Sequence, residues 1–278
     1  MIHLLGASHI MAILDACAGT SPPAAVPNFG RGAPPAFMDW PVQPGMLPDR
    51  LQVASIHASH TAPFWGPTLV DMLPGGQLGV ADGLRALLAA AHADAACQTL
   101  FITLRGEEYF NLGIAGVAHP FDFVLPQRPD LAPLPDRALV PLALVQQQLD
   151  AQLARTLLTL TAVRKLCPRL AVVRIPAPPP ASSAAVAAWA ATRDRPEQIH
   201  KVPTSVRLKL WLLSEQRSVQ HAASLGLQCL PVPAEALDPV GTLRADLMQD
   251  GIHGNARYGA LVCAQMAAIV TETMEGVH

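Results

Sequence analysis

The chain has 278 residues, of which 51% are hydrophobic and 14% are charged, and its formal net charge is −2. A chain of this length buries roughly three-quarters of the surface that its unfolded form exposes, so its core needs neither disulfides nor metal ions. The 19 basic and 21 acidic side chains form no basic stripe with interleaved aromatic residues, which argues against a nucleic-acid partner. Because no uninterrupted apolar stretch reaches the roughly 20 residues that cross a bilayer, we expect no membrane span.

The cysteines and the amino-terminal segment indicate the compartment. The cysteines are odd in number and form no Cys-x-x-Cys pair; they are Cys17, Cys97, Cys167, Cys229 and Cys263. This usage fits buried thiols in a reducing compartment better than a disulfide framework. The amino-terminal run is apolar, but His3, His9 and Asp15 interrupt it, and no lysine or arginine occurs before Arg31. A signal peptide needs a basic amino-terminal region, so we expect a cytoplasmic protein.

The chain begins with two short strands on either side of an irregular segment. Residues 2–5 are an apolar run that predicts a buried strand, and Gly6 indicates a tight turn after it. Residues 19–50 contain eight prolines. Because proline lacks a backbone N–H and fixes φ, we expect an irregular surface excursion there. Residues 51–56 have the length and composition of the second strand.

A helix, a strand and a second excursion come next. Residues 79–96 predict a helix, and residues 99–104 (TLFITL) predict a buried central strand. Residues 109–137 read as a second irregular excursion. The clearest helical pattern then begins at Leu142, since apolar side chains recur at intervals of three and four residues as far as Val163.

The last third of the chain adds another strand, a third excursion and a further helix. Residues 170–175 are rich in β-branched side chains and predict a strand. The Pro-rich residues 176–203 predict a third irregular excursion. Residues 204–225 predict a helix, with Thr204 or Ser205 as its N-cap.

The final strand and helix complete a pattern that indicates the fold class. Residues 227–230 predict a strand, and residues 256–273 predict a helix with Asn255 as its N-cap. The alternation of short apolar strands with long helices is typical of a parallel sheet covered on both faces. We therefore expect a three-layer α/β/α protein with about five parallel strands, whose sites lie at the carboxyl ends of the strands. Neither a repeat nor a polar linker divides the chain, so residues 1–278 are expected to form one domain.

The first candidate site is Gly6-Ala7-Ser8-His9, directly after the first strand. A serine there lies at the amino end of the following helix, where unpaired N–H groups and the helix dipole favour a developing negative charge. The N–H of Ser8 is then a candidate oxyanion donor. A serine that only caps the helix occupies the same position, so this motif alone fits both interpretations.

The second candidate site is Asp250-Gly251-Ile252-His253, in the loop before the last helix. A serine hydroxyl is a weak nucleophile that needs an imidazole to take its proton, and the imidazole needs a carboxylate to fix its tautomer. One tight turn, with Gly251 at the bend, supplies both groups. A surface turn with two polar residues is the alternative interpretation of this motif taken alone.

The third candidate site is the segment RGEEYFN, directly after the central strand. Gly106 allows the backbone to approach a ligand closely, and Asn111 has a side-chain N–H to donate. Arg105 either binds a substrate carboxylate or pairs with Glu107 or Glu108. A pair of adjacent acidic residues is more often simply solvated.

Taken together, these blocks resemble the SGNH (GDSL-like) hydrolases, in which the nucleophile comes first along the chain and the acid–base pair comes last. The block at Gly6 to His9 is similar to the Gly-Asp-Ser block of the family, with Ala7 in place of the aspartate. The block that begins at Asp250 matches the last block of the family, including the residues that follow it, Gly254, Asn255 and Tyr258. The blocks follow the family's order from one end of the chain to the other. The residues that match the family lie only within these blocks.

The resemblance implies a flavodoxin-like fold and hydrolysis of an acyl ester, by an esterase or a deacetylase. It implies Ser8 as the nucleophile, His253 as the general base and Asp250 as the partner that orients the base. The middle block of the family is Gly-x-Asn, whose asparagine donates to the oxyanion, but Glu107 stands at that position here. Either Asn111 substitutes for it, or the oxyanion hole lacks one donor, which costs on the order of 10²–10³ in rate.

The resemblance also implies a glycine oxyanion donor after the second strand. Gly66, Gly75 and Gly76 are the candidates. We expect Gly66 to be this donor, because it follows the strand beside Phe64 and Trp65, two possible walls of a pocket.

We expect a small-molecule acyl ester as the partner, and neither a cofactor nor a metal. His57 and His60 are spaced like a pair of metal ligands on a helix, but no carboxylate cluster accompanies them, so loop histidines are the expected interpretation. Two rival functions stay open. Glu107 would repel an oxyanion if it faced the pocket, which suggests an inactive protein of this fold that binds a ligand. An acyltransferase would use the same Ser-His-Asp triad.

Overall fold

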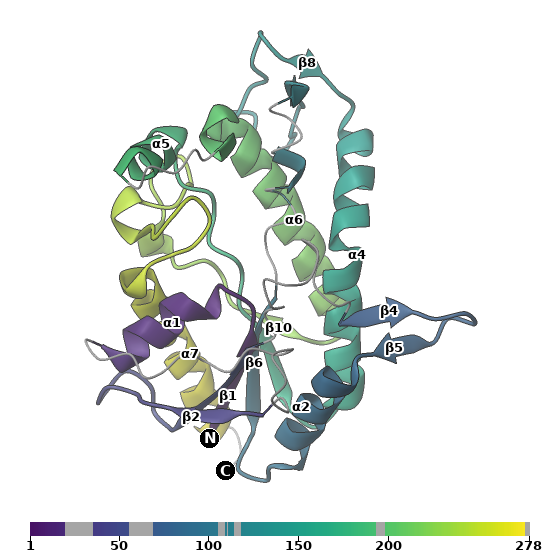
Figure 1. Cartoon of the computed structure of the whole chain (residues 1–278), viewed down its shortest axis with the longest axis vertical. Coiled ribbons are helices and arrows are strands. Elements are labelled where there is room, and N and C mark those ends of the chain that lie inside the picture. Colours follow the sequence, from purple (N-terminus) through teal and green to yellow (C-terminus); the bar gives the residue numbers. More distant parts are fainter. Residues whose placement is uncertain are drawn as a thin grey trace.

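The computed structural model describes residues 1–19, 36–55, 69–104, 109, 111–113, 118–192 and 198–275. Within these residues the middle layer is a six-stranded sheet of order β10-β9-β6-β1-β3-β2 (Figure 1). Its strands are β1 (Ile2–Gly6), β2 (Met38–Trp40), β3 (Leu51–Ser55), β6 (Thr99–Thr103), β9 (Ala171–Arg174) and β10 (Gln228–Cys229). All pairings are parallel except that of β2 with β3. Counted along the chain, the parallel strands have the order 2-1-3-4-5 of flavodoxin-like folds, so the predicted fold class is confirmed.

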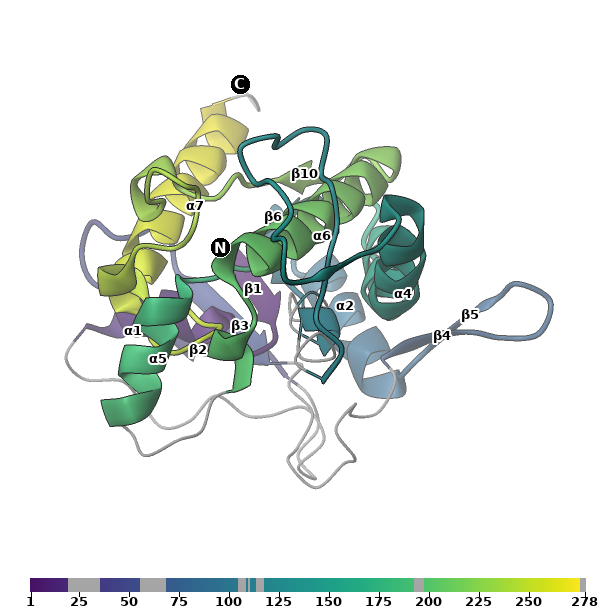
Figure 2. The same ribbon diagram turned by 90° about the horizontal axis from the view of Figure 1, so that it is seen from above.

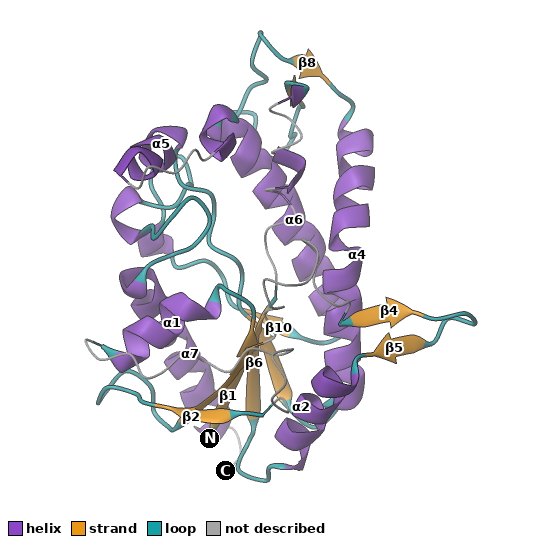
Figure 3. Cartoon of the chain, viewed as in Figure 1, coloured by secondary structure: helices purple, strands orange, loops and turns teal. Residues whose placement is uncertain are grey.

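Helices cover both faces of this sheet (Figure 3). Their bounds are α1 (Ile10–Ala18), α2 (Asp82–Ala93), α4 (Leu142–Leu166), α5 (Ser183–Thr192), α6 (Thr204–Ser224) and α7 (Ala256–Glu275), with 3-10 turns at Gln198–Lys201, Ala234–Ala236 and Ala245–Leu247. Helices α1 and α7 cover one face, and α2 with the second halves of α4 and α6 covers the other. None of the helices in the described part is both long and apolar enough to cross a membrane.

The central strands are buried on both faces. In β1, Ile2 and Leu4 join the core beneath α1 and α7, whereas Leu5 joins the core beneath α2 and α4. This alternation is the two-residue period of a strand. It explains why the strands appear in the sequence as continuous apolar runs rather than as alternating patterns.

Strand β2 was not predicted, because it lies inside the Pro-rich segment 19–50. It has three residues and sits at the edge of the sheet, so the proline that follows it costs no inner hydrogen bond. Trp40 anchors it: the buried side chain donates from Nε1 to the carbonyl oxygen of Leu14 at 3.1 Å. A single tertiary contact of this kind leaves no periodic signal in the sequence.

A hairpin outside the main sheet corrects the start of the second predicted helix. Strands β4 (Val70–Met72) and β5 (Leu78–Val80) pair antiparallel and project from the body of the molecule (Figure 2). Residues 79 and 80 therefore belong to a strand, and α2 begins at Asp82. Gly75 and Gly76, two candidates for an oxyanion donor, form the turn of this projecting hairpin with positive φ angles of 83° and 77°.

One predicted N-cap is confirmed and the other is wrong. The side-chain oxygen of Asn255 accepts hydrogen bonds from the N–H groups of Arg257 and Tyr258 at 3.0 and 3.2 Å, as expected for the cap of α7. At the start of α6, however, Pro203 occupies the N-cap position, in place of Thr204 or Ser205. The hydroxyl of Thr204 accepts instead from the N–H of Ser183 at the start of α5.

The second and third predicted excursions contain more regular structure than expected. Helix α5 lies within the segment 176–203, where its alanine-rich sequence and the cap from Ser182 Oγ to the N–H of Ala185 (3.1 Å) favour a helix despite the flanking prolines. Within 109–137, residues 109 and 111–113 are helical. Strand β7 (Phe121–Asp122) pairs there with β8 (Ala138–Leu139).

A buried ion pair attaches this second excursion to α6. The ammonium group of Lys209 bonds to the carboxylate of Asp122, and both side chains are fully buried. Lys209 also donates to the carbonyl oxygen of Phe123 at 2.8 Å. The N–H groups of Phe123 and Leu134 donate to Asp122 at 2.7 and 3.0 Å. Each buried charge therefore has its counter-charge only while the other side chain is present.

We expect Lys209→Met to lower the free energy of unfolding by about 3–5 kcal/mol, because it leaves the Asp122 carboxylate buried without a counter-charge. Urea denaturation of the purified variant measures this loss. Arg217→Met is the control. Arg217 pairs with Asp150 at 3.1 Å, but these side chains are 36% and 49% exposed, so this variant should lose much less unfolding free energy. Equal losses in the two variants would contradict the account of the buried pair.

Candidate active site

The turn after β1 places Ser8 at the carboxyl end of the central sheet. The N–H of Ala7 donates to the carbonyl oxygen of Thr103 at 3.0 Å, which extends the pairing with β6 by one residue. The N–H groups of Ile10 and Met11 then bond back to Ala7 and Ser8 at 3.1 Å, and α1 begins. Ser8 is half-buried at this junction. It follows the carboxyl end of β1, which is the end of the parallel strands where open α/β proteins hold their sites.

Gly6 makes this turn sterically possible. A Cβ atom on residue 6 would lie 2.2 Å from Cγ2 of Ile10 and 2.9 Å from the carbonyl oxygen of Thr103. The second contact is with the backbone of a central strand, which cannot move aside. The strand therefore turns into α1 with a glycine at its last residue.

The loop before α7 is a self-supporting turn that holds Asp250 in one orientation. The N–H groups of Ile252 and His253 donate to Oδ1 of Asp250 at 2.8 and 2.7 Å. The N–H of Gln249 donates to the carbonyl oxygen of His253 at 2.9 Å and closes the turn. An aspartate that bonds the backbone two and three residues ahead is a common way to fix a tight turn, so one oxygen of Asp250 organises the loop and the other is left for a further partner.

The structure brings Ser8, His253 and Asp250 into one hydrogen-bonded series. Nδ1 of His253 lies 2.8 Å from Oδ2 of Asp250, and Nε2 of His253 lies 2.8 Å from Oγ of Ser8. With the proton on Nδ1 shared with the carboxylate, Nε2 carries the lone pair that accepts the hydroxyl proton of Ser8. His253 and Asp250 are 23% and 27% exposed, so the series faces solvent at one side.

The electrostatics keep the carboxylate ionised. Burial acts to raise the pKa of Asp250, but the hydrogen bond and charge of His253, with the N–H groups of His253 and Ile252, lower the pKa further than burial raises it. Asp250 is therefore a carboxylate throughout the neutral range, which is the form that orients an imidazole and stabilises its cation.

This lowered pKa has a consequence for stability that can be measured. Asp250 stabilises the fold above its unfolded pKa of about 3.9, and the contribution disappears as the pH falls through the lower folded value. We expect the difference in unfolding free energy between the natural chain and Asp250→Asn to shrink as the pH falls from about 6 to about 3. Guanidinium titrations at several pH values measure this difference. A difference that is constant over this range would contradict the assignment.

Close packing of α1 on α7 joins the two ends of the chain at this site. A Cβ atom on Gly259 would lie 1.8 Å from the carbonyl oxygen of Ala12, so the two helix backbones are in contact there. Helix α1 begins two residues after Ser8, and α7 begins three residues after His253. The helix contact therefore sets the separation of the hydroxyl from the imidazole, although 245 positions separate these residues in the sequence.

The chain resembles two solved structures at low sequence identity. One is the inhibitor-bound aryl esterase of M. smegmatis, with 13% identity and a TM-score of 0.40; the match covers 98% of this chain and 99% of that chain. The other is a carbohydrate acetylesterase from Sinorhizobium meliloti, with 12% identity and a TM-score of 0.38 over 98% of this chain and 99% of that chain. Both are esterases. No protein-family model and no curated protein matches the sequence.

Four of the residues that the sequence nominated for substrate and oxyanion binding lie outside the described residues: Gly66, Arg105, Gly106 and Glu107. Asn111 is described. It lies in the helical segment after β6 and is half-buried. Among the described residues, no hydrogen bond links Asn111 to the Ser8–His253–Asp250 series. Its role as an oxyanion donor therefore stays a prediction.

His9, which the sequence placed in the first candidate block without a role, also lies at the site. The ring of His9 packs against the ring of His253, with the centroids 4.9 Å apart and the planes at 45°. His9 is 7% exposed. Its position next to Ser8 in the sequence indicated that it lies near the nucleophile. The contact with His253, however, depends on the packing of the two chain ends and has no signature in the sequence.

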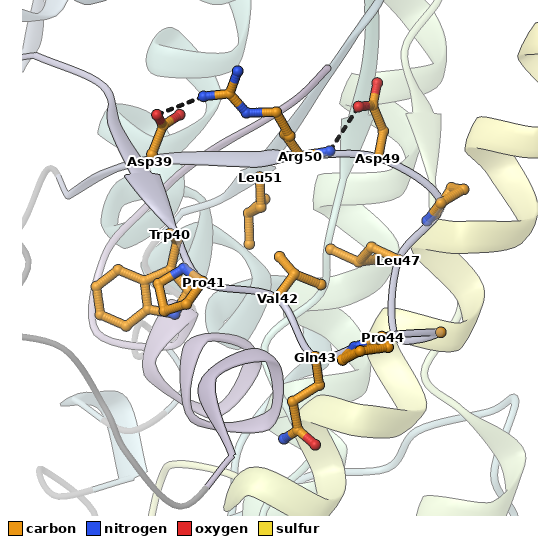
Figure 4. Close-up of a pocket in the computed structure, with 12 residues that line it drawn as sticks. Asp39, Trp40, Pro41, Val42, Gln43, Pro44, Leu47, Asp49, Arg50 and Leu51 are labelled. Atoms are coloured by element: carbon orange, nitrogen blue, oxygen red, sulfur yellow. Dashed lines mark hydrogen bonds and ion pairs between the residues drawn. The ribbon is translucent and has the colours of Figure 1, made fainter.

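A pocket of about 500 Å³ lies elsewhere, within the loop between β2 and β3 (Figure 4). Its rim carries the ion pair between Arg50 and Asp39 at 2.6 Å. Leu51 lines the pocket and pairs with Ile2, at the amino end of the parallel strands, whereas Gly6 and Ser8 lie at the carboxyl end. The pocket is therefore at the opposite end of the sheet from the candidate site and takes no part in it.

Proposed function

We propose that this protein is a serine hydrolase that cleaves a carboxylic ester of a small molecule, as a divergent member of the SGNH hydrolases. Ser8 is the nucleophile and His253 is the general base. Asp250 orients the base and stabilises the cation that the base becomes. The observation that carries the proposal is the pair of 2.8 Å contacts, Oδ2 of Asp250 to Nδ1 of His253 and Nε2 of His253 to Oγ of Ser8. Such a series makes a hydroxyl nucleophilic at neutral pH.

In the first step, Oγ of Ser8 attacks the ester carbonyl while Nε2 of His253 takes the hydroxyl proton. Asp250 stabilises the imidazolium cation that results, through its hydrogen bond to Nδ1. The tetrahedral intermediate collapses when the imidazolium gives its proton to the departing alcohol oxygen. An acyl group then remains bonded to Ser8, and His253 is neutral again.

In the second step, a water molecule takes the place of the alcohol. His253 removes one proton from this water as its oxygen attacks the acyl carbonyl. The acid is released, and the proton returns to Oγ of Ser8. The partial exposure of His253 and Asp250 supports this step, because water reaches the imidazole without a change of fold.

The N–H of Ser8 is the proposed first donor to the oxyanion. It makes no hydrogen bond within the part of the chain that the structure describes, and it lies at the amino end of α1, whose dipole favours negative charge there. Gly66 and Asn111 are the proposed further donors. If Glu107 leaves the oxyanion hole one donor short, the rate falls by a factor on the order of 10²–10³ and hydrolysis continues.

The test is turnover of p-nitrophenyl acetate by the purified chain at neutral pH, with p-nitrophenyl esters of longer acids as a series. The proposal expects saturable release of p-nitrophenol well above the rate in buffer. Added alcohols or sugars show whether an acyl ester forms in place of the free acid, which would indicate an acyltransferase. A folded protein that turns over none of these esters would favour an inactive ligand-binding protein.

A further inference from the structure

The contact between the rings of His9 and His253 involves a residue outside the Ser8–His253–Asp250 triad. His253 is bonded at both nitrogens, to Asp250 and to Ser8. Two bonds at opposite sides of a ring do not by themselves set its tilt about the line that joins the two partners. The ring of His9 packs against this imidazole, with centroids 4.9 Å apart and the planes at 45°, so it opposes such a tilt.

The position of His9 is itself fixed. His9 is the N-cap residue of α1, with helical φ and ψ of −65° and −16°, and only 7% of it is exposed. A buried ring at the start of a helix has little room to move, so it can restrain the ring that packs against it. A misplacement of about 1 Å in an active site costs on the order of 10²-fold in rate. We propose that His9 is a positioning residue, which holds the His253 imidazole in the plane that joins Ser8 to Asp250.

The test of this inference, which rests on the proposed function, compares His9→Ala with His9→Phe. We expect His9→Ala to lower kcat for p-nitrophenyl acetate roughly 10–100-fold with little change in KM. His9→Phe keeps a flat ring and should stay within a few-fold of the natural chain. Thermal unfolding of both variants checks that the fold is kept. Unchanged kcat in His9→Ala, or an equal fall in both variants, would overturn the inference.

A second measurement does not depend on turnover. In ¹⁵N–¹H spectra of the histidine side chains, His253 of the natural chain should show a single tautomer with sharp signals, because its ring is held. His9→Ala should broaden these signals or mix the tautomers, and His9→Phe should restore them. Spectra that are the same in all three proteins would overturn the positioning role even if the ester were never hydrolysed. Absence of turnover by the natural chain, by contrast, would count against the proposed function.

A different observation concerns the helices that carry the site. Cys17 of α1 and Cys263 of α7 are fully buried, and their sulfur atoms lie 3.6 Å apart. The backbones of these helices touch at Ala12 and Gly259, about one turn before the two cysteines. A disulfide bond has an S–S distance of about 2.05 Å, so the two sulfur atoms must still approach each other for the bond to form. The structure assigns Cys17 and Cys263 as a site of disulfide formation that links α1 to α7.

The oxidant in this reaction is a peroxide. Sγ of Cys17 attacks the peroxide, one water leaves, and a sulfenic acid forms. Sγ of Cys263 then attacks the sulfur of Cys17 and releases a second water, so that two thiols lose two electrons and two protons in all. The hydrogen bond from Cys263 lowers the pKa of Cys17, and it outweighs the opposite effect of burial. Cys17 is therefore the thiol that begins the reaction.

The matched controls are two buried thiols without this geometry. Burial raises the pKa of Cys97 to about 12 and that of Cys167 to about 11. Their sulfur atoms donate to the carbonyl oxygens of Thr99 and Leu88, at 3.7 and 3.4 Å, rather than contacting another sulfur. Neither thiol should react before the pair.

The test treats the full chain with hydrogen peroxide, blocks the remaining thiols after unfolding, and maps the peptides by mass spectrometry without reduction. We expect a linked peptide pair that contains Cys17 and Cys263 and is lighter by two hydrogen atoms. It should be absent from Cys263→Ser, and the melting temperature should rise by roughly 5–10 °C on oxidation. Blocked thiols at both positions, oxygen adducts without a link, or a link between other cysteines would overturn this second inference.

Discussion

Ser8→Ala is expected to lower kcat for p-nitrophenyl acetate by a factor on the order of 10⁴–10⁶, because it removes the atom that forms the acyl-enzyme. Steady-state assays with the natural chain and the variant at equal concentration measure the loss. The fold should survive, since the half-buried Ser8 hydroxyl makes one hydrogen bond to the described residues, with Nε2 of His253. The melting temperature of the variant should therefore stay close to that of the natural chain.

Ser224→Ala is the matched control for this experiment. Ser224 is an exposed residue at the end of α6, and its hydroxyl donates to the carbonyl oxygen of His221 at 2.7 Å. The substitution also removes one hydroxyl and one hydrogen bond, but it does so away from His253. We expect full activity from it. Full activity in Ser8→Ala, in a protein that melts normally, would remove Ser8 from the mechanism.

Asp250→Asn is expected to lower kcat by a factor on the order of 10⁴ while the loop stays folded. The amide oxygen of an asparagine can still accept the N–H groups of Ile252 and His253, which bond to Oδ1 at 2.8 and 2.7 Å. Its NH₂ group, however, donates to Nδ1 of His253 and moves the ring proton to Nε2. That nitrogen then donates toward Ser8 and no longer accepts its proton.

The control for the aspartate substitution is Asp246→Asn. Asp246 lies on the same loop and pairs with Arg244 and Arg257, at 3.1 and 2.9 Å, near the surface. Its loss should change kcat little, because none of these contacts involves His253. If Asp246→Asn and Asp250→Asn lowered kcat equally, the effect would come from the loop as a whole and not from the orientation of the imidazole.

Much of the fold followed from local patterns in the sequence. The five parallel strands were predicted because a strand buried on both faces is a continuous apolar run, as in residues 99–104. The helix that begins at Leu142 was predicted from its apolar spacing, and it extends to Leu166. Strand β2 and helix α5 were missed because proline-rich surroundings masked them, and a tertiary contact of Trp40 stabilises the first of them.

The site could be nominated because its chemistry is written in two short blocks, one at Ser8 and one at Asp250 to His253. What joins these blocks is the contact between the backbones of α1 and α7, at Gly259 and Ala12. No local pattern encodes a contact between helices so far apart in the chain. For the same reason, the ring of His9 against His253 emerged only from the folded chain.

The buried ion pair between Asp122 and Lys209 was also not predictable from local sequence patterns. Asp122 lies within residues 109–137, which the sequence predicted as an irregular excursion. Its carboxylate is instead fully buried on the ammonium group of Lys209, which comes from a helix 87 positions later. Sequence patterns show which residues are apolar, but they do not show which two charges meet in the interior.

Reaction with a fluorophosphonate, followed by mass spectrometry of the labelled peptide, measures whether His253 activates the hydroxyl of Ser8. Such a reagent phosphonylates a serine hydroxyl only when a neighbouring base activates it. We expect one label per chain, on Ser8, at neutral pH, and loss of the label in His253→Ala. A folded natural chain that takes up no label, or that is labelled at Ser8 equally well without His253, would contradict the proposed mechanism.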